Sequence, residues 1–446
     1  MLSDPIAALS TPPGRSAIAV VRLSGEGALE VAAQVVSGSL HEAPERTALL
    51  ATFLAPDGAP IDRGLVTIYR APHSYTGHDL VEFSCHGGLL APAELLAALH
   101  AAGARQAAPG EFTRRAVLNG KLDLLQAEAV GDLIEATAPA QRRAALHQLD
   151  GGLSRRLGAL REELLELLAV LAYDIDFPEE DDGPVAPERV LGRLDVARQA
   201  VASLLATAPA GERLREGALV VIAGPPNAGK SSLFNALLGA SRALVTEIAG
   251  TTRDTIEAPA SVLGWPVRLA DTAGLRDADD RIEQLGIEVS RRYVAAADLV
   301  LLCLDAGRPV TGEERALAVE HAALIVRTKA DLALSWMPGP EDGVPVSSLT
   351  GQGLDRLAEA IGGRVFGGAG QGPDLAPMLT RERHRVALAR AATALDDARP
   401  HLRRGGDAVL VAHHVHIAVA ALDELIGIVH PDEVLGRVFE RFCVGK

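Results

Sequence analysis

The stretch LVVIAGPPNAGKSS at residues 219–232 restricts what this chain can fold into more than any other segment. Its apolar, β-branched beginning predicts a buried parallel strand, and the helical spacing from Ser231 onward predicts a helix directly after it. The connection from Gly224 to Ser231 matches G-x-x-x-x-G-K-S, a loop whose backbone N–H groups cradle phosphates. Lys230 suits the β- and γ-phosphates, and the Ser231 hydroxyl suits Mg²⁺. A chance glycine-rich turn is the alternative, which the flanking strand and helix disfavour.

Composition limits the class of protein. A length of 446 residues predicts about three domains, and a net charge of −15 argues against a broad basic face for nucleic acid. Any RNA contact is therefore expected to be local or shared with a partner protein. Cys85, Cys303 and Cys443 are too far apart for a disulfide framework or a metal motif, which fits a cytoplasmic location. We expect no signal peptide and no apolar run long enough to span a bilayer.

Lysine is rare in this chain. Among the 43 basic residues only Lys121, Lys230, Lys329 and Lys446 are lysines, and the rest are arginines. An arginine- and alanine-rich composition indicates that lysine has been replaced wherever arginine is tolerated. The remaining lysines are therefore candidates for positions that require a compact ammonium group, the alternative being chance survival at ordinary surface positions.

Residues 1–117 have the pattern of an α/β domain. Strands are expected at 16–23, 64–70 and 79–85, helices at 28–36 and 91–102, and turns at the Gly- and Pro-rich segments 11–15, 55–60, 86–88 and 109–112. His86 precedes two glycines, so a turn position is favoured over a catalytic role.

Two segments of the chain have helical periodicity, residues 118–215 and 371–446. Helices are expected at 122–136, 140–174, 187–206 and within 379–443, with breaks at Pro139, 405–406 and Pro431. The nucleotide-binding pattern and a Gly-rich linker at 367–377 occupy residues 216–370 between them. We therefore expect a multidomain α/β and all-α protein: an N-terminal α/β domain, a helical domain built from both helical segments, and an inserted Ras-like P-loop domain.

Two polar clusters in the helical segments are weak metal candidates. The acidic run DIDFPEEDD at 174–182 favours a solvated loop over a cation site. His413 and His416 are three residues apart, so one helix face presents both, but no acidic or cysteine ligand has matching spacing. A place on the helix surface is therefore favoured for these histidines and for His414.

Further motifs follow the phosphate loop in the order expected of a nucleotide hydrolase. DTAG begins at Asp271, which suits the Mg²⁺ shell, and Gly274 suits a γ-phosphate oxygen through its N–H. Thr252, in TEIAGTTRDT, suits Mg²⁺ as a second hydroxyl ligand in a mobile loop.

Base recognition is predicted at TKAD, residues 328–331, and at Ser347-Ser348-Leu349. Asp331 suits the N1–H and exocyclic amine of guanine, Lys329 suits the face of the base, and backbone N–H groups at 347–349 suit the guanine oxygen. TKAD alone would be consistent with a surface turn. All the motifs in order favour a GTPase over an ATPase.

The motifs GPPNAGKS, TEIAGTTRD, DTAG and TKAD resemble the TrmE–Era–EngA group of GTPases. The flanking segments STPPGR, SYTGHDLVEFSCHGG, PGEFTRRAVLNGKLDLLQAEAV, DIDFPEE and FCVGK resemble the MnmE/TrmE family of tRNA-modification GTPases, over essentially the whole chain. Lys121 and Lys446 lie in these family motifs, so all four lysines have a place in a motif.

The resemblance implies that the N-terminal domain dimerises and binds 5-formyl- or methylene-tetrahydrofolate. The matching positions are Arg22, Glu82, Lys121 and Lys446. A basic cluster suits the glutamate tail of the folate, and a carboxylate suits the pterin N–H groups. An ordinary strand-end ion pair is the alternative for Arg22 and Glu82.

The resemblance also implies the extent of the GTP site. It comprises Asn227, Ala228, Gly229, Lys230, Ser231, Ser232, Thr246, Glu247, Ile248, Ala249, Gly250, Thr251, Thr252, Asp271, Thr272, Ala273, Gly274, Thr328, Lys329, Ala330, Asp331, Ser347, Ser348 and Leu349.

The family is implied to use K⁺ in place of an arginine finger, between paired G domains. The matching K⁺ ligands are Asn227, Thr246, Ile248 and Thr251, and those of Mg²⁺ are Ser231 and Thr252. Glu283 matches the residue that orients the attacking water, with Arg276 as a supporting candidate and Lys230 acting on the phosphates.

Two positions need separate interpretation. Cys443 matches a cysteine implied in the tRNA chemistry, and the cations at Lys446 and Arg441 favour a nucleophilic or redox thiol; a small packed residue is the alternative. The usual Asn of the family's base motif is replaced by Thr328, which keeps a hydroxyl but loses the amide. We expect lower guanine affinity, with Asp331 still setting the preference for GTP.

The resulting expectation is a cytoplasmic, homodimeric, K⁺-stimulated GTPase. With an FAD-dependent MnmG/GidA-type partner in a heterotetramer, it would add a carboxymethylaminomethyl-type group at C5 of the wobble uridine, position 34, of certain tRNAs. One alternative is a ribosome-assembly GTPase, for which the expected basic RNA-binding appendage is not visible. A second is a folate-dependent aminomethyl transferase that the GTPase merely regulates.

Overall fold

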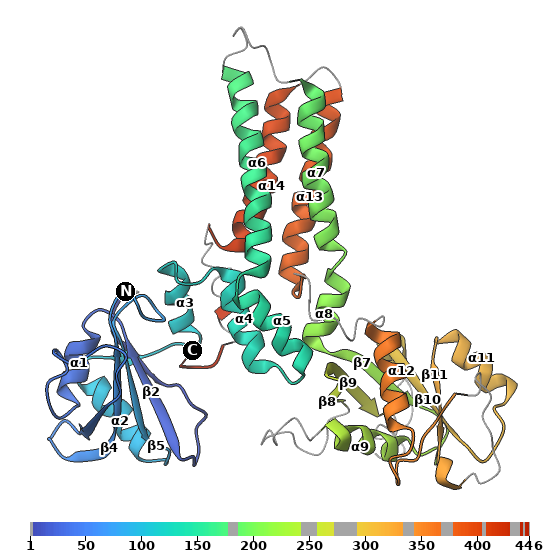
Figure 1. The fold of residues 1–446 in the computed structure, drawn as a ribbon, viewed down its shortest axis with the longest axis horizontal. Coiled ribbons are helices and arrows are strands. Elements are labelled where there is room, and N and C mark those ends of the chain that lie inside the picture. The colour runs from blue at the N-terminus through green and yellow to red at the C-terminus, as the bar shows by residue number, and fades with distance from the viewer. Residues whose placement is uncertain are drawn as a thin grey trace, which may run out of the picture. The chain divides into compact units, whose positions relative to one another are not determined.

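The computed structural model describes residues 3–176, 186–241, 257–271, 292–332, 343–366, 378–403, 407–428, 438–439 and 442–445. Its contacts divide the chain into two compact units, Met1–Gly131 with Leu422–Lys446, and Asp132–Ala421. The first unit contains a mixed sheet, and the second contains long helices and a mostly parallel sheet (Figure 1). The expected combination of α/β and all-α parts is confirmed, whereas the expected domain boundaries stay predictions.

The described part of the first unit has a six-stranded sheet in the order β3-β4-β5-β2-β1-β6. Its strands are β1 (Ile6–Leu9), β2 (Ile18–Ser24), β3 (Leu49–Leu54), β4 (Pro60–Tyr69), β5 (Leu80–His86) and β6 (Arg105–Gln106). Neighbouring strands are antiparallel except β1 and β6. The three expected strands are present as β2, β4 and β5, and β1, β3 and β6 are additional.

Helices α1 (Ala28–Gln34) and α2 (Ala91–Ala101) pack against this sheet. Ala19, Val21 and Leu23 of β2 are buried in the same core as these helices, so the alternate residues of β2 lie on the other face. Phe53 and Phe83 meet edge to face in this core, with ring centroids 5.7 Å apart.

A buried ion cluster joins helix α3 (Glu111–Leu118) to the edge of the sheet. The Arg115 side chain has no exposed surface and contacts Asp4 Oδ1 at 3.0 Å and Glu111 Oε1 at 3.2 Å. Arg105 also contacts Glu111, at 2.5 Å. The expected turn at 109–112 therefore needs correction: left-handed Gly110 (φ 66°) precedes a helix that begins at Glu111.

The second unit and its neighbouring segments contain the long helices. Their bounds are α4 (Leu124–Glu135), α5 (Pro139–Leu149), α6 (Gly152–Asp176), α7 (Pro187–Leu205), α8 (Ala208–Glu216), α13 (Glu382–Arg403) and α14 (Ala408–Ile426). The helix expected at 140–174 is interrupted, because Gly151 has φ 79° and ends α5 before α6 begins. Helix α8 was not expected.

Helices from the two flanks of the nucleotide-binding sequence pack side by side (Figure 1). Helix α7 buries Val190, Leu194, Ala197, Val201 and Leu204, a stripe with helical spacing. Helix α13, which contacts it, buries Leu388, Ala391, Leu395 and Ala398. A helical domain built from two segments is therefore confirmed.

Helix α14 corrects the expectation about apolar runs. By length and composition it is sufficient to cross a membrane, with a mean hydropathy of 1.5 over 18 residues, and no other helix among the described residues passes this test. Val411, Val415 and Ala418 are nevertheless buried in the protein, as they are in the core helix of a bundle.

The sheet of the second unit has the order β12-β11-β10-β7-β9-β8 over the described residues. The strands are β7 (Ala218–Ala223), β8 (Glu257–Val262), β9 (Trp265–Asp271), β10 (Leu299–Asp305), β11 (Leu324–Thr328) and β12 (Val344–Pro345). All neighbours are parallel except β8 and β9. Helices α9 (Lys230–Ser241), α11 (Gly312–Glu320) and α12 (Leu354–Phe366) surround it (Figure 1).

An apolar joint connects this sheet to the helices within the second unit. Trp265 stacks on Phe366 with ring centroids 4.6 Å apart, and Ala140 and Leu214 are buried in the same cluster. The Ala140 N–H donates to the carbonyl of Gly264, at the turn between β8 and β9, over 2.9 Å. Strand β9 therefore runs from the helices at one end to Asp271 at the other.

The ion cluster makes the stability of the first unit depend on pH in the acidic range. Burial alone would raise the pKa of Glu111, but hydrogen bonds from Arg105 and from the Ala108 N–H lower it from 4.5 to about 2. A carboxylate whose pKa is lower in the folded state than in the unfolded state stabilises the fold at any pH above its unfolded-state pKa. This stabilisation is lost as the pH falls through the folded-state pKa. We expect hydrogen-exchange protection of the α3 amides to decrease between pH 4.5 and 2.

The Glu111→Gln variant tests this expectation, because it removes the titrating group and should show a flatter pH profile. Glu94→Gln, on the exposed face of α2, is the matched control and should retain the wild-type profile. An identical profile for Glu111→Gln and the unsubstituted protein would contradict the role given to Glu111.

Candidate nucleotide-binding site

The glycine-rich loop after β7 lies directly on the neighbouring strand β10. Gly224 has φ 146°, and a Cβ placed there would lie 2.3 Å from the carbonyl oxygen of Cys303. Asn227 (φ 61°) and Gly229 (φ 80°) also have left-handed backbone conformations. The loop is therefore a tight turn that depends on glycine at its first position.

Lys230 lies inside this loop rather than on the surface. Its side chain is buried, and its Nζ donates to the carbonyls of Gly224 at 3.1 Å and Pro225 at 2.9 Å. Helix α9 begins at Lys230, with Ser231 and Ser232 exposed at its N-terminus. The predicted strand–loop–helix is confirmed, and it presents an ammonium group, free helix N–H groups and two hydroxyls together.

The carboxyl ends of the parallel strands bring the other described motifs to the same edge of the sheet. Asp271 ends β9 and pairs with Ile222, two residues before Gly224. Asp305 ends β10 and pairs with Thr328 at the end of β11. This edge is where open α/β sheets bind ligands.

The Ala330 N–H, in the first predicted base-recognition segment, donates over 3.2 Å to the carbonyl of Val346, the residue directly before the second. Lys329 Nζ lies 2.9 Å from Asp305 Oδ2. A hydrogen bond from the Gly307 N–H, followed by that from Lys329, lowers the pKa of Asp305. The Ser347 Oγ accepts from the Thr350 N–H, so this loop is closed on itself.

Several predicted site residues lie outside the described residues. They are Thr246, Glu247, Ile248, Ala249, Gly250, Thr251, Thr252, Thr272, Ala273, Gly274, Arg276, Glu283, Arg441 and Lys446. Their proposed roles stay predictions.

In the first unit, Arg22 and Glu82 form a cross-strand pair between β2 and β5, with Nη2 and Oε1 2.7 Å apart. The Arg22 guanidinium also lies 5.7 Å from the centre of the Tyr75 ring and 5.8 Å from that of Phe112. The Tyr69 hydroxyl donates to Glu82 at 3.5 Å. Burial, followed by the charge of Glu82, raises the pKa of Tyr69.

No sequence motif marks these three aromatic residues as neighbours of the Arg22 and Glu82 pair. Tyr69 could have been found, because β4 pairs with β5 and places it on the same face as Glu82. Tyr75 lies in a loop and Phe112 in a helix, and no periodic signal marks either. Lys121 Nζ donates to the carbonyl of Pro72, in the segment that leads to Tyr75.

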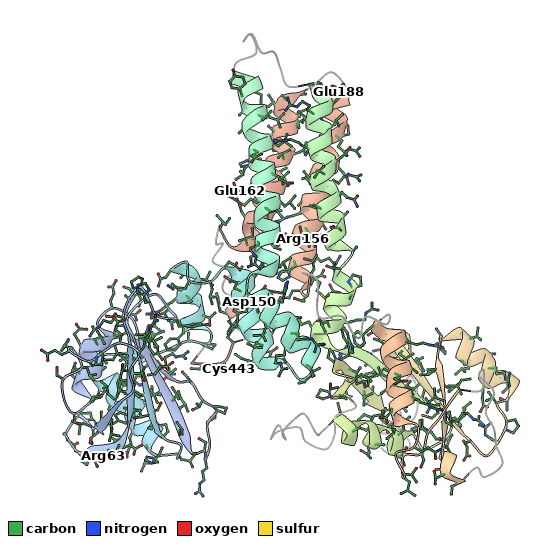
Figure 2. All side chains as sticks on the ribbon, viewed as in Figure 1. Arg63, Asp150, Arg156, Glu162, Glu188 and Cys443 are labelled. Atoms are coloured by element: carbon green, nitrogen blue, oxygen red, sulfur yellow. The ribbon has the colours of Figure 1, made fainter. Side chains whose placement is uncertain are left out.

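The chain end packs within the first unit. The Ser10 Oγ donates to the Gly445 carbonyl at 3.0 Å, and the Gly110 N–H donates to that of Cys443 at 3.4 Å. Phe442 packs with the buried residues of α3 and α4. The Cys443 side chain, labelled in Figure 2, is exposed, which contradicts its interpretation as a packed residue.

The histidine candidates have ordinary surroundings. His86 is not in a turn but ends β5, where its Nδ1 lies 2.8 Å from Asp62 Oδ1. His414 stacks with His401 on α13 and contacts His413 edge to face. Over the described ranges, no group of three His, Cys, Asp or Glu side chains has a geometry that could hold a metal.

The close contact at Gly224 generates a test. We expect Gly224→Ala to destabilise the second unit by about 2–4 kcal/mol, because a Cβ collides with the β10 backbone and φ is unfavourable. Affinity for a fluorescent GDP analogue should fall more than about tenfold, roughly 1.4 kcal/mol. Gly239→Ala on α9, where a Cβ meets nothing within 4 Å, is the control and should be neutral or stabilising in urea unfolding.

Comparison with known proteins agrees with this geometry. The family model described as GTP-binding protein TrmE N-terminus matches residues 5–121, and that of the MnmE helical domain matches residues 124–443. A Thermus thermophilus protein named tRNA modification GTPase MnmE is 46% identical to this chain, over 100% of this chain and 99% of the relative. A Moorella thermoacetica protein of the same name is 43% identical to it, over 100% of both chains. The chain therefore belongs to the MnmE/TrmE family of tRNA modification GTPases.

Proposed function

We propose that this chain hydrolyses GTP to drive a tRNA modification, the addition of a carboxymethylaminomethyl-type group at C5 of the wobble uridine, position 34. Its membership of the family supports a GTPase in tRNA modification. One structural observation carries the nucleotide part: Lys230, Asp271, Thr328 and Asp331 all lie at the carboxyl edge of the parallel strands of one sheet. An FAD-dependent partner of the MnmG/GidA type, joined in a heterotetramer, would supply the redox chemistry.

The residues of the loop account for phosphate binding. Lys230 is already held inside the loop by hydrogen bonds to two loop carbonyls. When a nucleotide binds, the Lys230 ammonium would exchange these carbonyls for phosphate oxygens. Ser231 and Thr252 would hold Mg²⁺, and Asn227, Thr246, Ile248 and Thr251 would hold K⁺. When bound, both cations would supply positive charge at the transferring phosphoryl group. Glu283 would orient the attacking water, and Asp331 would read guanine.

K⁺ dependence is the sharpest test of this assignment. We expect GTP hydrolysis by the full chain to be at least about tenfold faster in KCl than in NaCl, which corresponds to an activation barrier lower by about 1.4 kcal/mol. The reason is that K⁺, bound between paired G domains, would add positive charge at the transferring phosphoryl group. Asn227→Ala should lose this stimulation, whereas Asn235→Ala, exposed on α9 outside the loop, should keep it. Equal rates in both salts from a monomer would exclude the mechanism.

The first unit supports a folate role. The Arg22 and Glu82 pair is a quarter exposed or less, and it is bordered by Tyr69, Tyr75 and Phe112. Aromatic rings beside a paired cation and carboxylate suit a flat heterocycle with N–H donors. We propose that Arg22, Glu82, Lys121 and Lys446 bind a tetrahydrofolate derivative, with the exposed Cys443 acting on the base, in a cytoplasmic homodimer.

The proposed GTP site and the proposed folate site lie in different compact units, so the two activities can be tested independently. We expect Lys230→Ala to lower GTP hydrolysis at least about 100-fold, or 2.7 kcal/mol, because it removes the phosphate ammonium. Modification of tRNA should be lost together with GTP hydrolysis. The affinity for 5-formyltetrahydrofolate, measured by titration, should stay unchanged. Modification that persists without hydrolysis would instead favour a transferase that the GTPase merely regulates.

A further inference from the structure

Thr328 replaces the usual asparagine of the base-recognition motif, and its side chain is only 2% exposed. Its Oγ1 lies 2.6 Å from the carbonyl oxygen of Ala228 in the glycine-rich loop and 3.2 Å from that of Leu304 in β10. A hydroxyl has one proton to donate, so the shorter contact, to Ala228, is the one that it makes. Strand β11 is therefore bonded to the loop that would hold the phosphates.

This hydrogen bond determines which way one loop peptide faces. In a planar trans peptide the C=O and the N–H point in opposite directions. Because the Ala228 carbonyl points toward Thr328, the N–H of Gly229 points away from it, out of the protein interior. Gly229 has φ 80°, and a Cβ placed on it would lie 3.5 Å from that of Thr328, so the peptide rests directly on this side chain.

Threonine suits this task because its side chain is short and stiff. Two heavy atoms on its Cβ restrict χ1, so the hydroxyl direction is fixed by the strand. The burial of Thr328 leaves no surface for contact with a base. Asp331, Ser348 and Leu349 are more exposed than Thr328.

We propose that Thr328 is a positioning residue for the phosphate loop and not a reader of guanine. By holding the Ala228 carbonyl it orients the Gly229 N–H toward the phosphates of the bound nucleotide. This inference rests on the proposed GTP-binding function and specifies the role of one residue within it.

The experiment compares Thr328→Val, which keeps the shape and removes the hydroxyl, with Thr328→Ser, which keeps the hydroxyl. Dissociation constants of the full chain are measured for GTP, GDP and ITP, which lacks the 2-amino group of guanine. T328V should weaken all three by the same factor of about ten, and T328S should stay within about threefold of the unsubstituted protein. Thr328→Ala is a second hydroxyl-free variant that should match T328V.

Two control variants define the background. Thr380→Val removes a buried hydroxyl from the segment before α13. This hydroxyl has no hydrogen-bond partner among the described residues, so the substitution should leave nucleotide binding unchanged. Asp331→Asn should change the ratio of GTP to ITP affinity, as a base-reading residue must. Thermal melting of each variant verifies that the second unit is folded.

The outcomes separate this inference from the proposed function. A T328V or T328A protein that binds GTP as tightly as the unsubstituted chain would overturn the positioning role, and so would a change confined to the GTP-to-ITP ratio. A uniform loss that serine rescues would support it. If the unsubstituted protein bound no GTP at all, the proposed function would fail together with this inference.

Discussion

The nucleotide site depends on the pairing of β7 with β9 and β10. Strand β7 (Ala218–Ala223) is almost entirely buried, and apolar residues on both its faces give it parallel neighbours on either side. Parallel strands end at one edge, so Gly224, Asp271 and Asp305 meet there although more than 80 residues separate the first from the last. The chemistry at this edge is therefore a consequence of how a buried strand satisfies its hydrogen bonds.

The loop at this edge is supported from beneath by backbone and side chain together. The Cys303 carbonyl approaches Gly224 so closely that no side chain fits, and Thr328 holds the Ala228 carbonyl. Lys230 closes the loop from within by donating to two of its carbonyls. A loop held in this way loses little conformational freedom when a phosphate binds, so more of the interaction free energy contributes to affinity. Buried Cys303, whose pKa burial raises to about 12, acts here as packing and not as a thiolate.

Most of the elements follow from local patterns, and the exceptions have physical reasons. Periodicity predicted α7 and strands β2, β5 and β7 closely, because each buries one face or both. It did not predict β1 or β3, whose short runs of small and apolar residues carry weak alternation, and it joined α5 to α6 across Gly151 because the apolar spacing continues through the break. The Gly- and Pro-rich pattern at 109–112 predicts a turn, although left-handed Gly110 directly precedes helix α3.

The sequence by itself determined the chemistry: the phosphate loop, the four lysines in motifs, and the family are all visible in the order of residues. These signals are local, since a loop that must approach phosphate leaves its glycines and its lysine at fixed spacing. Only the tertiary structure decided which groups support one another. It placed Thr328 under Ala228, one hundred residues away, and surrounded Arg22 with rings from Tyr75 and Phe112. Such contacts depend on strand order and on packing between distant segments, and neither leaves a periodic trace in the sequence.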